Sequence, residues 1–137
     1  MKVRNLIGAA IVAACGVARA HAGEDGSWWK VAATMDGKTT YDIKTGSLIT
    51  TPKGAAIVTT RVVDEDTHVI KFHLMGLRLQ SCAEQQGQLT VFDLNGNKIV
   101  SMDFVLGGGS ITSAVAEGIC DMAYSHVSHT RAPAANL

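Results

Sequence analysis

The sequence contains no run of lysine and arginine, no pair of cysteines at C-x-x-C spacing, and no apolar stretch of membrane-spanning length. The absent basic run, with 12 basic against 12 acidic residues, argues against an electrostatic nucleic-acid binder. The absent cysteine pair argues against a metal site of the zinc-ribbon type. The charge-free stretch from Leu6 to Ala14 is shorter than the roughly 20 apolar residues that a membrane-spanning helix needs.

Signatures of catalysis are also missing. No serine lies in a G-x-S-x-G motif, and the glycines at 107–109 are not followed by the Lys-Ser/Thr pair of a phosphate-binding loop. We therefore predict that the protein is not an enzyme and has no catalytic residues, no metal and no cofactor.

The N-terminus has the pattern of an export signal, with the basic MKVRN followed by the apolar LIGAAIVAA. Two cleavage sites compete. Ala20-His21-Ala22 is an A-x-A site that makes 1–22 a signal peptide and leaves Gly23 as the new N-terminus. Alternatively, 1–14 is a lipoprotein signal and Cys15 is the acylated residue. The three charged residues of 1–22 are all basic, so their loss leaves 9 basic against 12 acidic residues and a net charge of about −3 on the mature domain.

Either cleavage leaves Cys82 and Cys120 as the two remaining thiols in an oxidising compartment. The simplest state is one disulfide, which closes a loop of about 39 residues and contributes about 4 kcal/mol in the chain-entropy model. Two buried free thiols are the alternative.

Most of the remaining chain has the pattern of short strands separated by turns. Strands are expected over 28–35, 39–43 and 55–63, and within 67–79, where Gly76 interrupts the pattern. Asp36-Gly37 and Asn95-Gly96 predict two-residue type I′ hairpin turns. Around the second turn, residues whose numbers add up to 191 face each other, so that Val91 meets Val100, Leu89 meets Met102 and Phe92 meets Ile99.

A helix is expected after the glycines at 107–109. Ser110 is a suitable N-cap, and apolar residues recur at helical spacing from Ile111 to Met122. Gly118 lies in this apolar stripe and is expected to allow close approach to the sheet. The predicted fold class is α+β: an antiparallel sheet of about five to six strands, covered by a C-terminal α-helix and tied by one disulfide. Residues 23–124 form one domain, and 125–137 are expected to be a flexible tail.

Trp28 and Trp29 are adjacent in the first predicted strand. Alternation places one in the core and one outside. An outward tryptophan can anchor a partner, so both are candidate partner contacts.

Several features of residues 28–122 occur together: Trp28, TTYDIKTGSL (39–48), AAIVTTRVV (55–63), Cys82, LTVFDLNGNKIVSMDF (89–104) and Cys120. In these features the domain resembles the surface-adhesin protein E family of Gram-negative bacteria. The resemblance implies an antiparallel sheet with a C-terminal helix held by a disulfide, and export to the periplasm or outer surface. The best-known relatives bind host extracellular matrix proteins, and no catalytic residues come with the family.

The sequence therefore predicts an exported binding module of the cell envelope. Its partner is a protein, either a host matrix protein or an envelope component, and not a nucleic acid. Membrane contact is expected only through a lipid anchor on Cys15. The alternative is a periplasmic structural or inhibitor-type accessory protein. Oligomeric state and ligand identity do not follow from the sequence.

Overall fold

The computed structural model describes residues 27–135, with side chains as far as Ser125. The expected signal peptide 1–22, the alternative lipoprotein signal 1–14 and Cys15 lie outside the described residues. The elements along the chain are β1 (Trp28–Ala33), β2 (Thr39–Lys44), β3 (Ile49–Thr50), β4 (Ala55–Asp64), β5 (Val69–Arg78), α2 (Leu79–Glu84), β6 (Gln86–Phe92), β7 (Lys98–Val105) and α3 (Ile111–Ala135).

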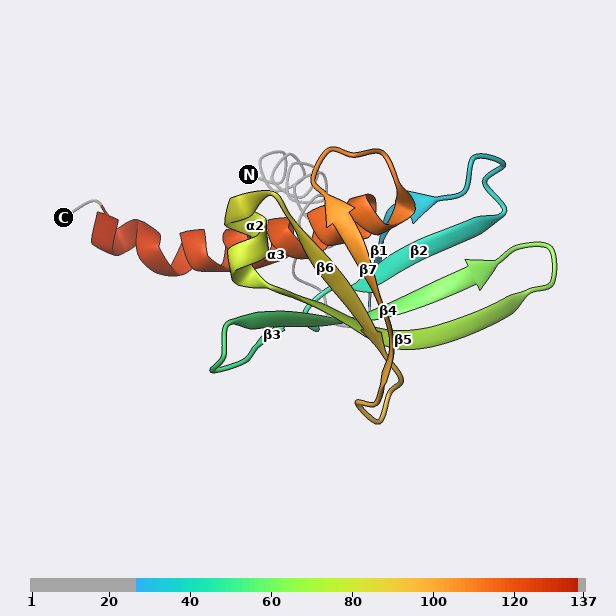
Figure 1. The fold of residues 1–137 in the computed structure, drawn as a ribbon, viewed down its shortest axis with the longest axis horizontal. Coiled ribbons are helices and arrows are strands. Elements are labelled where there is room, and N and C mark those ends of the chain that lie inside the picture. Colours follow the sequence, from blue (N-terminus) through green and yellow to red (C-terminus); the bar gives the residue numbers. More distant parts are fainter. Residues whose placement is uncertain (1–26, 136–137) are drawn as a thin grey trace, which may run out of the picture.

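The strands form one antiparallel seven-stranded sheet in the order β1-β2-β4-β5-β6-β7, with the short β3 paired to β4. Figure 1 shows α3 lying along one face of this sheet. Strand β4 illustrates how the sequence selects that face. Ala56, Val58 and Thr60 are buried and alternate with less buried neighbours, as expected when one side of a strand packs on a core. The predicted fold class is confirmed.

Helix α3 supplies the other half of the core. Its N-cap is Ser110, whose hydroxyl oxygen accepts a hydrogen bond from the backbone N–H of Ser113 at 3.0 Å. A Cβ on Gly118 would lie 2.8 Å from Val31 Cγ1 and 3.1 Å from Ile43 Cδ1, so glycine is required for the close approach that the sequence predicted. The helical residues buried against the sheet are Val115, Ala116, Ile119, Cys120 and Ala123.

A disulfide between Cys82 in α2 and Cys120 in α3 links the helix to the segment between β5 and β6. The two Cα atoms are 5.7 Å apart, and both residues are buried. The predicted disulfide is thus present, and the alternative of two free thiols is excluded.

Strand β5 runs through Gly76 without a break, which corrects the expected interruption. The glycine is needed because a Cβ there would lie 2.9 Å from Ile57 Cγ1 on the neighbouring strand. The strand ends at Arg78, and the short helix α2 follows where the sequence predicted only the end of a strand. Six residues are too few to show a helical apolar period.

Both hairpin turns differ from the predicted type I′ geometry. Within each turn only the glycine has positive φ, +76° at Gly37 and +91° at Gly96. Its N–H donates to the carbonyl three residues earlier, on Thr34 and Asp93 respectively. Each is a type I turn that ends on a left-handed glycine. The second loop is one residue longer than predicted, because the Asp93 N–H donates to the Asn97 carbonyl. The first loop is two residues longer, because the Thr34 N–H donates to the Thr39 carbonyl.

The carboxylate of Asp93 explains the second turn. It accepts hydrogen bonds from the backbone N–H groups of Asn95 and Asn97, both at 2.9 Å, and so competes with the tighter turn. The predicted pairs further along β6 and β7 are confirmed, but the longer loop shifts the register near the turn. Phe92 consequently pairs with Lys98, so the predicted pair with Ile99 is wrong.

Helix α3 continues past Tyr124 to Ala135, where the sequence predicted a flexible tail. Residues 125–132 contain neither glycine nor proline, so nothing in them stops a helix that has already begun. Residues 136 and 137 lie outside the described residues.

Candidate binding site on the open face of the sheet

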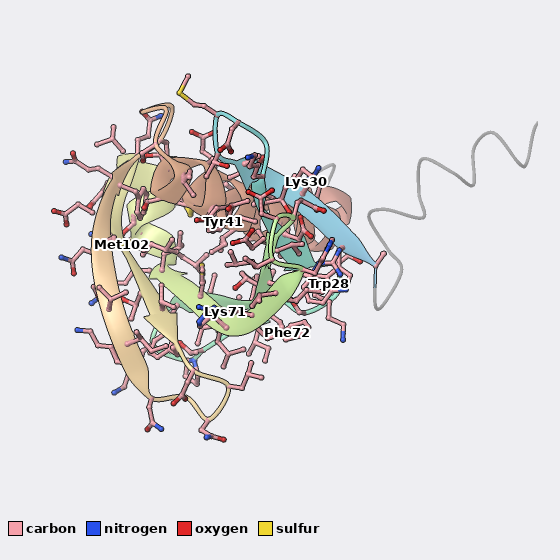
Figure 2. The ribbon with its side chains drawn as sticks, turned by 90° about the vertical axis from the view of Figure 1, so that its right-hand side faces the viewer. Trp28, Lys30, Tyr41, Lys71, Phe72 and Met102 are labelled. Carbon is pink, nitrogen blue, oxygen red and sulfur yellow. A yellow bond between two sulfur atoms is a disulfide. The ribbon has the colours of Figure 1, made fainter. Side chains whose placement is uncertain are left out.

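The sheet has a second face, opposite α3, on which no described helix packs (Figure 2). We call it the open face. One row of side chains crosses it through four neighbouring strands, because Lys30 pairs with Asp42, Asp42 with Arg61, and Arg61 with Phe72. Directly paired residues project from the same side of a sheet. Together with Trp28, these residues form what we call the open-face cluster.

The centre of the open-face cluster is an ion pair between neighbouring strands. Arg61 Nε donates to Asp42 Oδ2 at 2.7 Å, and the side chains of Arg61 and Asp42 are 29% and 6% exposed. Asp42 Oδ1 is buried and has no hydrogen-bond partner in the part of the chain that the structure describes. The buried negative charge of Asp42 is therefore balanced by the guanidinium group of Arg61.

Trp28 covers the guanidinium group. The Arg61 Cζ atom lies 4.6 Å from the centre of the Trp28 ring, within cation–π distance. The same ring meets Phe72 with a centroid distance of 5.9 Å and an interplanar angle of 49°. The two aromatic rings and the guanidinium thus support one another in a fixed arrangement.

Apolar side chains surround this arrangement without being covered. Phe72 is 46% exposed. Ile70, two residues earlier in β5 and therefore on the same face, is 47% exposed. Ile49 on β3 is also exposed. Exposed apolar side chains around a rigid aromatic cluster are typical of a protein-interaction surface.

Positive charge borders the apolar patch. Lys30 is exposed at one end of the row, and Lys44 pairs with Trp28 across β1 and β2. The only acidic residue of the cluster is Asp42, whose charge is already balanced by Arg61. The open face therefore combines exposed apolar groups with positive charge at its border.

The two candidate tryptophans lie on opposite faces of the sheet. Trp28 belongs to the open-face cluster, whereas Trp29 pairs with Ile43, a fully buried core residue, and so faces the helix side. Sequence analysis did not single out Arg61, Asp42 or Phe72. Alternation along AAIVTTRVV marks Arg61 as facing away from the core, but its neighbours depend on the pairing of three strands.

Two aspartates outside the cluster have lowered pKa values for a structural reason. A hydrogen bond from the backbone N–H of Lys38 lowers the pKa of Asp36, with help from the Thr34 hydroxyl. A hydrogen bond from the backbone N–H of Asn97 is the largest cause of the lowered pKa of Asp93. Both carboxylates stabilise hairpin turns.

Within the residues that the structure describes, no group of three or more His, Cys, Asp or Glu is arranged to hold a metal ion. Over the same range, none of the helices combines the length and the apolar character needed to cross a membrane.

The fold and this surface define a small, disulfide-linked α+β domain whose uncovered sheet face carries an aromatic and cationic cluster. Comparison of the chain with protein-family models, with curated proteins and with solved structures finds no significant match.

Proposed function

We propose that the protein is an exported, non-enzymatic binding module of the cell envelope that holds a protein partner on its open face. The observation that carries the proposal is the cluster of Trp28, Arg61 and Phe72, which is rigid, partly exposed and left uncovered by α3. Aromatic residues and arginine are the side chains that most often dominate binding energy in protein interfaces.

The chemistry of the cluster supports binding over catalysis. Its one carboxylate is held in an ion pair, and its other polar side chains, Lys30 and Arg61, are cations. No nucleophile lies beside a general base in it, as covalent catalysis requires.

Export is supported by the leader-like N-terminus and by the disulfide. The Cys82–Cys120 bond is buried and links two elements of the core, and structural disulfides of this kind persist in oxidising compartments. We place the protein in the periplasm or at the outer surface of a Gram-negative cell. The resemblance to surface adhesins favours a host extracellular matrix protein as the partner.

Binding to purified extracellular matrix proteins tests the proposal with two matched variants on one strand. Phe72→Ser removes an exposed ring from the open face, and Val69→Ser removes a side chain of similar exposure, 45%, from the other face of β5. We expect Phe72→Ser to weaken binding at least tenfold, about 1.4 kcal/mol, and Val69→Ser to leave it unchanged. Equal binding by both variants and the unmodified protein would exclude the open face.

The alternative function is that of a periplasmic accessory protein that inhibits or supports another bacterial component. The same open face serves either role, so location distinguishes them. Protease treatment of intact cells should degrade a surface adhesin, and a protein that stays intact until the outer membrane is opened is the periplasmic alternative.

A further inference from the structure

Strand β7 is one edge of the sheet, and part of its backbone has no partner among the residues that the structure describes. It ends the strand order, and no strand of the described residues lies beside its outer side (Figure 2). The start of α3 reaches this side only at Val105. The Val105 N–H points away from β6, since it donates to Ser113 Oγ at 3.3 Å, while the Leu106 N–H donates back to the Gln85 carbonyl. Backbone groups of alternate residues in a strand point in opposite directions across the sheet.

The direction of every backbone group in the middle of β7 follows from this alternation. Register with β6 is regular from Val105 back to Val100, so Ser101 and Asp103 also turn their N–H and C=O groups outward. The carbonyl of Val105 is occupied, because it accepts from the Gly108 N–H. The outer edge of β7 therefore offers two donors and two acceptors, on Ser101 and Asp103.

These four groups are self-complementary about Met102. If a second β7 lies antiparallel with a two-fold axis at Met102, each Ser101 faces the Asp103 of the other copy. Such a pair exchanges both of its N–H···O bonds, so all eight backbone groups are used and four hydrogen bonds form. The axis is perpendicular to the sheet, and side chains that face each other lie on the same side.

The side chains agree with this register. Val100, which is 43% exposed in the single chain, meets Phe104, so two apolar side chains face each other. The pairing ends before Val105, because Ser113 and Gly108 already occupy the outward backbone groups of Val105. An axis at Asp103 would set two carboxylates opposite each other, and like charges in that position are destabilising. In the register centred on Met102, Asp103 faces the Ser101 hydroxyl instead.

We propose that β7 pairs with β7 of a second copy of this chain around Met102, which joins the two sheets into one. The free edge carries no proline, and no bulge interrupts β7 between Val100 and Val105, so it lacks these common devices that prevent edge-to-edge association. Because the axis is perpendicular to the sheet, the two open faces lie on the same side of the dimer.

Cysteine cross-linking of protein produced from the full-length gene tests the register. Met102→Cys places two thiols in a non-hydrogen-bonded pair, where Cα atoms are about 4.5 Å apart, and we expect a disulfide-linked dimer under mild oxidation. Val100→Cys is the control, since its two copies are offset by four residues, about 13 Å, and should not cross-link. Peptide mapping checks that Cys82 and Cys120 remain paired.

Two further variants test whether a dimer forms through the β7 edge or through another surface. Ser101→Pro removes an outward N–H, which an edge strand tolerates, and Met102→Lys sets two charges at the axis. Sedimentation of the unmodified protein should show a concentration-dependent dimer, and both variants should be monomeric while circular dichroism shows them folded. A monomer at every concentration up to about 1 mM, equal cross-linking of the two cysteine variants, or a dimer that survives both substitutions would overturn the proposal.

Discussion

Arg61 donates from Nε to the carboxylate of Asp42 across the boundary between β4 and β2, on the face of the sheet that α3 leaves open. The ion pair is more than a surface contact, because Asp42 is 5% exposed and its second oxygen has no hydrogen-bond partner among the described residues. It also fixes the guanidinium under Trp28. Stability and the proposed binding surface thus depend on the same two residues.

Removal of Arg61 alone should therefore destabilise the protein strongly. Arg61→Met leaves a buried carboxylate without compensation, and we expect a loss of about 3 kcal/mol in the free energy of unfolding, measured in urea. The double variant Asp42→Val/Arg61→Met should recover most of that loss, since no buried charge remains. If Arg61→Met is as stable as the unmodified protein, the Asp42 carboxylate is solvated and the prediction is wrong.

Gly118→Ala tests the contact between α3 and the sheet. Alanine is favoured over glycine in a helix by about 1 kcal/mol, but its Cβ would overlap Val31 and crowd Ile43. Overpacking typically costs about 1–3 kcal/mol, so we expect a net loss of roughly 1 kcal/mol in thermal or urea unfolding. Asp121→Ala on the exposed side of the same helix is the control and should not destabilise.

The disulfide between Cys82 and Cys120 should stabilise the folded domain. Cys82→Ala/Cys120→Ala opens a loop with a sequence separation of 38 and should lower the free energy of unfolding by up to about 4 kcal/mol. The reduced, unmodified protein should unfold at nearly the same urea concentration as the double variant. If reduction leaves the urea midpoint unchanged, α3 is held by packing alone.

The turn carboxylates predict a pH dependence of stability. The folded-state pKa of Asp93 is lowered below its ordinary value of 3.8, so its contribution is complete above that value and is lost as the pH falls through the folded pKa. Asp93→Asn should remove the part of the pH dependence of stability that comes from this carboxylate. NMR titration of the Asp93 carboxyl carbon should give a midpoint below 3.8, and a midpoint at or above it would contradict the turn geometry.

The sequence predicted those features that depend on local patterns. The β-branched residues of 55–63 predicted β4, helical spacing and Ser110 predicted α3, and the pairing rule placed Leu89 opposite Met102. The turn type was missed because a side chain, Asp93, competes with the backbone preference of Asn-Gly.

The open-face cluster could not be predicted in the same way. Its members come from β1, β2, β4 and β5, and each pairing register must be known before Lys30, Asp42, Arg61 and Phe72 fall into one row. A shift of one residue in any strand would move its contribution to the opposite face. Only Trp28 was identified as a candidate from the sequence.

The most direct test of the account is photo-cross-linking from the open face in living cells. Benzoylphenylalanine replaces Phe72 in one strain and Val69, on the other face of β5, in a second strain. Both strains are irradiated alone and after exposure to extracellular matrix protein. The account predicts a discrete protein adduct from position 72 and none from position 69. Adducts of equal yield from both positions, or none from position 72, would contradict it.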